Sequence, residues 1–247
     1  MDGSRNISAV TTLVCATLLW LGGALAAPIN PPDVCGNAVA VGDSITAGVG
    51  ASDSYPAKIA NALGTSWSNQ GVSGDGWEHD RGDGNLTSLA STNVDPLLSS
   101  LRCANGLPPF LILFAGANDM WHGGYTPAQT YRFFQTYLSN RVLAGWDTRN
   151  MVVVTMLPIP TTDVSKADWQ AYNSMLVSGQ STYKYSVAYT IHDQNIGCFG
   201  CNKDQAYYNS DNVHPTDGGQ QILAKIICNS FNKLGDYGSC ARDAERR

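Results

Sequence analysis

Charged residues are scarce in this chain of 247 residues. Lys, Arg, Asp and Glu together make up 14% of it, the formal net charge is −5, and no cluster of Lys and Arg occurs. A nucleic-acid-binding protein needs a basic face that neutralises phosphates, so we expect no nucleic-acid partner. Ser, Thr, Asn and Gln replace the missing charges, which suits a soluble extracellular protein.

Long apolar stretches are also rare, and the one that stands out runs from Ala9 to Leu25. It follows a short polar start with Arg5 and ends in Ala24-Leu25-Ala26, a small-x-small cleavage signal. The run is at the short end for a membrane-spanning helix, and prolines follow it, which favours a signal peptide over a membrane anchor. We therefore predict a signal peptide over 1–26, a secreted domain over 27–247, and no membrane association.

Cysteine pairs of the kind that bind zinc are missing apart from Cys198 and Cys201, which have no second closely spaced pair to complete a site. We expect no metal and no cofactor. Cys15 lies in the predicted signal peptide, and an even number of cysteines remains, which favours three disulfides in an exported protein: Cys35, Cys103, Cys198, Cys201, Cys228 and Cys240. Export also makes Asn85, in the sequon Asn85-Leu86-Thr87, a predicted glycosylation site.

Short apolar runs alternate with helix-like patterns along the rest of the chain. Strands are predicted at 38–41, 66–70, 110–115, 151–157 and 186–191. Helices are predicted at 54–63, 87–101, 127–143, 166–181 and 217–234. This alternation is typical of a parallel sheet with right-handed crossovers and helices on both faces. Without an internal repeat or a linker, the sequence predicts one α/β domain.

Residues with catalytic chemistry follow the predicted strands. Ser44 comes directly after the first strand, Asn118 after the third, and Asp211 and His214 stand between the last strand and the last helix. In open α/β sheets such turns share one edge, where ligands bind. A serine hydroxyl becomes a nucleophile when a base takes its proton and a carboxylate orients that base. His214 alone is equally compatible with a surface histidine, and only the shared edge favours catalysis.

The motifs resemble the four blocks of the SGNH (GDSL) hydrolase family, in the family's order. The blocks are Gly42-Asp43-Ser44-Ile45, Asn69 through Gly74, Gly116-Ala117-Asn118-Asp119 and Asp211-Asn212-Val213-His214-Pro215. The resemblance implies a three-layer α/β/α domain with a flavodoxin-like sheet of about five strands in the order 2-1-3-4-5. It also implies that Ser44 attacks an ester carbonyl, that His214 is general base and then acid, and that Asp211 orients His214.

The same resemblance implies an oxyanion hole formed by the N–H groups of Ser44 and Gly74 and the side chain of Asn118. Gly71 is the second candidate for the glycine. Asp43 adjoins Ser44, but the short polar side chain is better suited to holding the turn through backbone hydrogen bonds.

Three further side chains follow the second and third blocks and are candidates for the substrate pocket, although packing would explain them equally: Trp77, Trp121 and His122. The implied strand order also suggests disulfides between Cys35 and Cys103, between Cys198 and Cys201, and between Cys228 and Cys240. A bridge from Cys35 to Cys228 or Cys240 is the alternative.

We expect a secreted monomeric serine esterase that removes short, acetyl-type acyl groups from a small molecule or a polysaccharide. The alternative is a lipase or thioesterase for longer acyl chains. A hypothesis from a different class is a non-catalytic carbohydrate-binding protein on a hydrolase scaffold, and the intact Ser44, Asp211 and His214 count against it.

Overall fold

The computed structural model describes residues 36–159, 164–191, 199 and 204–232 of the chain. Its strands form one parallel sheet in the order β2-β1-β3-β4-β5. The strands are β1 (Ala38–Gly42), β2 (Trp67–Gly71), β3 (Phe110–Phe114), β4 (Met151–Val154) and β5 (Ser186–Ala188). The predicted strand order is therefore confirmed.

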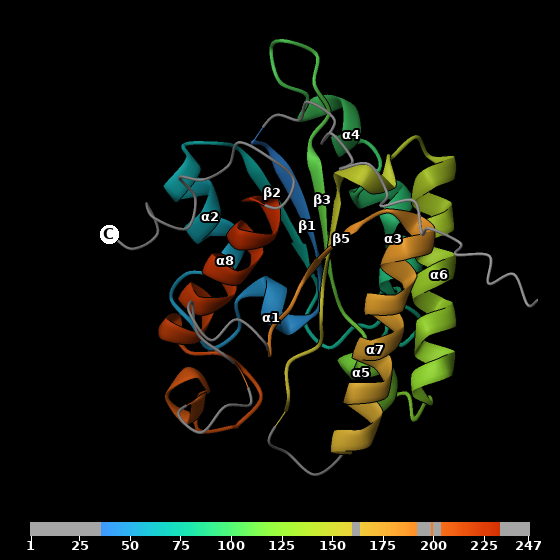
Figure 1. Cartoon of the computed structure of the whole chain (residues 1–247), viewed down its shortest axis with the longest axis vertical. Helices are drawn as coiled ribbons and strands as arrows, with labels where there is room; N and C mark the ends of the chain where they lie inside the picture. The colour runs from blue at the N-terminus through green and yellow to red at the C-terminus, as the bar shows by residue number, and fades with distance from the viewer. Residues whose placement is uncertain (1–35, 160–163, 192–198, 200–203, 233–247) are drawn as a thin grey trace, which may run out of the picture.

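Helices cover both faces of this sheet. The longer ones are α2 (Tyr55–Leu63), α3 (Leu86–Asn93), α6 (Pro127–Leu143), α7 (Lys166–Tyr183) and α8 (Asp217–Asn232). The short ones are α1 (Ser44–Ala47), α4 (Leu97–Ser100), α5 (Ala117–Trp121) and the 3₁₀ turns η1 (Thr148–Asn150) and η2 (Asp204–Tyr207). In Figure 1, α2 and α8 lie on one side of the sheet, and α3, α6 and α7 lie on the other. The predicted three-layer α/β/α fold is confirmed.

Strand β1 shows why the predicted central strands are continuous apolar runs in the sequence. Val39 and Val41 pack in the core beneath α3, α6 and α7, whereas Ala38 and Ala40 pack in the core beneath α2 and α8. Successive side chains point to opposite faces of a strand, so a sheet covered on both sides needs apolar residues at every position. The strand ends at Gly42, and the next residues lie at the carboxyl edge of the sheet.

Most helix boundaries follow local capping signals. Thr126 and Gln129 form a capping box before α6, and Pro127 occupies its first position, so the predicted helix over 127–143 is confirmed. The predicted helix over 87–101 is instead divided into α3 and α4. Pro96 lacks the N–H group that a continuous helix would need at this point. The carboxylate of Asp95 accepts hydrogen bonds from the guanidinium of Arg141 (2.8 Å) and the indole of Trp146 (3.1 Å).

Strand β3 is one residue shorter than predicted, and β4 and β5 each end three residues before the predicted position. The hydroxyl groups of Thr155 and Thr190 lie 2.9 Å apart beyond the ends of β4 and β5. The N–H of Thr155 still donates to the carbonyl of Ala188 (3.0 Å), but the N–H of Thr190 donates to the Oγ1 of Thr155 (2.9 Å) and that of Met156 to the Oδ1 of Asn173 (2.7 Å), so side-chain partners take over from the ladder there.

Of the cysteines predicted to form disulfides, only Cys103 and Cys228 fall within the described residues, and both are disulfide-bonded. The other four, like the predicted signal peptide, lie outside the described residues, so the pairing stays a prediction. Asn85 is the N-cap of α3 and accepts the N–H of Ser88 at 2.8 Å. Its glycosylation also stays a prediction. No described helix is both long and apolar enough to cross a membrane.

Candidate active site

Ser44 lies at the carboxyl end of β1, as the first residue of the short helix α1. Asp43 caps this helix, since its Oδ1 accepts the N–H of Ile45 at 2.9 Å. A Cβ on Gly42 would collide with Thr46 and with the carbonyl oxygen of Phe114, so only glycine allows this tight strand-to-helix turn. Asp43 therefore holds the turn, as the sequence predicts, and its burial raises the pKa of its carboxyl to about 7.

The loop between η2 and α8 brings a base and a carboxylate to Ser44. The Nε2 of His214 lies 2.9 Å from the Oγ of Ser44, and its Nδ1 lies 2.8 Å from the Oδ2 of Asp211. The other carboxylate oxygen of Asp211 accepts the N–H groups of Val213 (2.9 Å) and His214 (3.0 Å). The serine, histidine and aspartate predicted from the sequence thus form one continuous hydrogen-bonded chain.

Electrostatics in this chain favour an ionised Asp211. Partial burial acts to raise the pKa of its carboxyl, but the hydrogen bonds from the His214 ring and from the two N–H groups outweigh it and lower the pKa. An ionised carboxylate accepts the Nδ1–H of His214, which leaves Nε2 unprotonated and facing the hydroxyl of Ser44.

Two polar side chains outside the four motif blocks connect the His214 loop and α8 to the segment after Ser44 through hydrogen bonds. The buried Gln220 of α8 donates to the carbonyl of Ile45 (2.9 Å) and accepts the N–H of Tyr55 (2.8 Å). Asn209 donates to the carbonyls of Gly50 (3.0 Å) and His214 (3.1 Å). Sequence reasoning missed both residues, because a single amide in a helix or a loop carries no periodic or spacing signal.

The third side of the site comes from the loops after β2 and β3. The side-chain N–H₂ of Asn118 donates to the carbonyl of Asp75 at 2.8 Å. The buried carboxylate of Asp119 accepts three backbone N–H groups, those of Trp77 (2.8 Å), Glu78 (2.9 Å) and His79 (3.0 Å). The fourth residue of the Gly-Ala-Asn-Asp block thus holds the second block in place, a function that the sequence analysis did not assign to it.

Gly74 is better placed than Gly71 to donate to an oxyanion. Gly71 belongs to β2, and its N–H already donates to the Oδ1 of Asn69 (2.9 Å). Gly74 has a φ of +89°, and no hydrogen bond within the described part of the chain uses its N–H. The Gly74 N–H is therefore available to an oxyanion, and the structure favours Gly74 over Gly71.

A family model for GDSL-like lipases and acylhydrolases matches residues 40–222, which include all four blocks. The chain belongs to this GDSL family. Membership supports an ester-hydrolysing enzyme. No curated protein matches the sequence.

Several solved structures share the fold at low sequence identity. A protein from Lactobacillus plantarum is 18% identical with a TM-score of 0.62, over 83% of this chain and 99% of its own. A lipase/acylhydrolase from Enterococcus faecalis is 16% identical (TM-score 0.58), over 81% of this chain and 96% of its own. A variant of an acetyl-xylooligosaccharide esterase from Geobacillus Stearmophilus is also 16% identical (TM-score 0.58), over 83% and 97%.

The three pocket candidates have different environments in this GDSL protein. Trp77 is only 1% exposed, its indole N–H donates to the hydroxyl of Tyr172 (2.8 Å), and its ring packs 4.9 Å from that of Tyr137. The prediction that Trp77 lines the substrate pocket is therefore wrong, because the ring faces the core beneath α6. Trp121 and His122 stack at 4.5 Å where α5 ends, close to Asn118 in the chain, and remain candidates.

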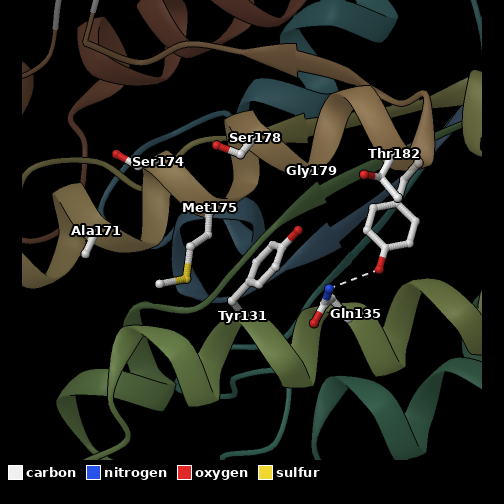
Figure 2. A pocket seen from close by; sticks show the side chains of 9 residues that line it. Tyr131, Gln135, Ala171, Ser174, Met175, Ser178, Gly179 and Thr182 are labelled. Atoms are coloured by element: carbon white, nitrogen blue, oxygen red, sulfur yellow. Dashed lines mark hydrogen bonds between the residues drawn. The ribbon is translucent and has the colours of Figure 1, made fainter. Parts of the chain in front are cut away.

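Two surface hollows of the GDSL domain lie on either side of α7, one of about 560 Å³ and one of about 570 Å³. Figure 2 shows the first, between α6 and α7, where Gln135 donates to the hydroxyl of Tyr183 at 3.0 Å. The residues that line these two hollows do not include Ser44, His214 or Asp211. The described residues also contain no group of three or more His, Cys, Asp or Glu placed to hold a metal ion.

Proposed function

We propose that the protein is a serine carboxylic ester hydrolase that works through an acyl-enzyme on Ser44. The observation that carries this proposal is the chain from Ser44 Oγ to His214 Nε2 (2.9 Å) and from His214 Nδ1 to Asp211 Oδ2 (2.8 Å). This geometry is within hydrogen-bond reach, as a general base needs to be when it activates a hydroxyl.

In the first half of the reaction, Ser44 Oγ attacks the ester carbonyl carbon while His214 Nε2 takes its proton. The tetrahedral intermediate then expels the alcohol, and His214 returns the proton to the leaving oxygen. In the second half, His214 removes a proton from water as the water oxygen attacks the acyl carbon, and the bond from that carbon to Ser44 Oγ then breaks. His214 returns the proton to Oγ, and the carboxylic acid leaves. Asp211 remains ionised and holds the imidazole in its orientation.

The negative oxygen of the intermediate would lie beyond the carboxyl ends of β2, β1 and β3, facing the N–H groups of Ser44 and Gly74 and the side-chain amide of Asn118. These donors come from three separate loops, and the bonds of Asp119 to residues 77–79 hold one of them rigid. Donors fixed before the reaction stabilise charge that appears only in the transition state, at no cost of reorganisation.

For the substrate we propose acetyl-type esters, including acetylated polysaccharide. The fold is compatible with this choice, since an acetyl-xylooligosaccharide esterase shares it, but a lipase/acylhydrolase shares it equally. Large apolar side chains exposed on the described surface are few: Val49, and the adjacent Val142 and Leu143 at the end of α6. A long acyl chain gains affinity by burying its methylene groups, so this surface favours short acyl groups over a lipase or thioesterase substrate.

A panel of p-nitrophenyl esters from acetate to palmitate, together with acetylated xylan, tests this proposal. We expect the highest kcat/KM for acetate, a decrease of more than tenfold by octanoate, and release of acetate from the xylan. A maximum at octanoate or longer would establish the lipase alternative. Folded protein that binds xylan and cleaves none of the esters would establish the non-catalytic alternative.

We also propose that the protein is exported and cleaved after Ala26. Its support is the order of a polar start, an apolar run and a small-x-small site in residues 1–26. N-terminal sequencing of protein from a culture medium should therefore begin at Ala27. Medium protein that begins at Met1 would contradict this proposal.

A further inference from the structure

Arg81 lies directly against Gly74, the glycine whose N–H faces the proposed oxyanion. A Cβ on Gly74 would collide with the Cδ of Arg81 and would lie 2.8 Å from its Nη1 and 3.0 Å from its Nε. The guanidinium thus occupies the space that any other side chain at position 74 would fill. Glycine at this position, with its φ of +89°, is what allows a cation so close to the reacting ester.

The loop that carries Arg81 is otherwise acidic, but none of its described carboxylates forms an ion pair with the guanidinium, and the buried Oδ2 of Asp75 has no hydrogen-bond partner among the described residues. Asp75 is 1% exposed, and its Oδ1 faces the backbone N–H of Arg81 at 3.4 Å. The Oδ1 of Asp80 accepts the N–H groups of Gly82 (2.6 Å) and Gly84 (2.9 Å). Among the described residues, no carboxylate lies within ion-pair distance of the Arg81 guanidinium, and the side chain is exposed.

Two hydrogen bonds hold the backbone of the loop that carries Arg81. Asn118 donates to the carbonyl of Asp75, the residue that follows Gly74, and Asp119 holds the loop backbone just before Arg81. Since the side chain of Arg81 lies against Gly74, the guanidinium is beside the proposed oxyanion hole. A guanidinium presents paired N–H donors that match the two oxygens of a carboxylate.

We propose that Arg81 is a specificity-determining residue that binds a carboxylate in the alcohol part of the substrate. The preferred substrates are then acetyl esters of acidic alcohols, such as an acetylated saccharide that carries a carboxylate. The inference rests on the proposed esterase function of Ser44. Since the net charge of the protein is −5, attraction of such a substrate comes from this local contact and not from the overall field of the protein.

The test compares two pairs of substrates that share the acetyl group and differ in charge: 3- and 4-acetoxybenzoate, and the corresponding uncharged acetoxybenzamides. The measured quantity is the ratio of kcat/KM for the anionic ester to that for its amide. In Arg81→Gln we expect this ratio to decrease about tenfold relative to the wild type for at least one pair, because the loss falls on the anionic ester more than on its amide. Arg81→Lys keeps the charge but loses the paired donors, so its ratio should lie between those of the wild type and Arg81→Gln.

Arg102→Gln is the matched control, because Arg102 is an exposed arginine before β3, at the opposite edge of the sheet from Asn118. It should leave both ratios at the wild-type value. An unchanged ratio in Arg81→Gln, or an equal loss for ester and amide, would overturn the assignment of Arg81. Wild-type protein that hydrolyses none of these esters would instead refute the esterase function, so the two failures are distinguishable.

Discussion

Ser44→Ala should lower kcat for ester hydrolysis by about 10⁴-fold or more, because it removes the nucleophile from a group of residues that act together. The Oγ of Ser44 is the atom that His214 approaches at 2.9 Å, and alanine leaves His214 with no hydroxyl to deprotonate. The rate of p-nitrophenyl acetate hydrolysis, corrected for the uncatalysed reaction, measures the loss. A fluorophosphonate should modify the wild type at Ser44, as peptide mass mapping would show, and should not modify the variant.

The chain offers a matched control for this substitution. Ser186 has the same exposed fraction as Ser44, 8%, but begins β5 at the opposite edge of the sheet. Ser186→Ala should therefore retain wild-type kcat and fluorophosphonate labelling. Labelling at a residue other than Ser44, or substantial turnover by Ser44→Ala, would exclude Ser44 as the nucleophile.

Asn118→Ala should lower kcat about 10²-fold with little change in KM, because it removes one donor to the oxyanion. The oxyanion exists only in the transition state and the intermediate, so the loss of this donor leaves ground-state binding nearly intact. Initial rates over a range of p-nitrophenyl acetate concentrations separate the two parameters.

A second buried amide serves as the control for Asn118. Asn173 donates to the carbonyl of Met156 (2.9 Å) and accepts its N–H (2.7 Å), away from the hydrogen-bonded chain of Ser44. Asn173→Ala should lower the free energy of unfolding, measured in urea, at least as much as Asn118→Ala, and should keep kcat within about twofold. If Asn118→Ala retains the wild-type kcat, its amide does not contact the oxyanion.

The order of the motifs was enough to predict which residues meet at the site. Ser44 and His214 are 170 positions apart in the sequence, yet their side chains lie within hydrogen-bond distance of each other. The reason is that parallel strands bring their carboxyl ends to a single edge, so a residue directly after a strand has its place in space set by topology. Trp77 shows where this reasoning stops. Its position after a loop did not reveal whether the ring turns outward to substrate or inward to Tyr137.

The sequence by itself determined the alternation of strands and helices, the family and the set of residues at the carboxyl edge, because periodicity, capping and short motifs are local properties of the chain. Only the tertiary structure decided which other side chains hold the residues at the carboxyl edge in position. The contact of Arg81 with Gly74, the three bonds accepted by Asp119 and the bridge from Gln220 to Ile45 and Tyr55 all join separate backbone segments. Such contacts depend on how loops pack in three dimensions, and neither residue of a pair carries a local signal of its partner.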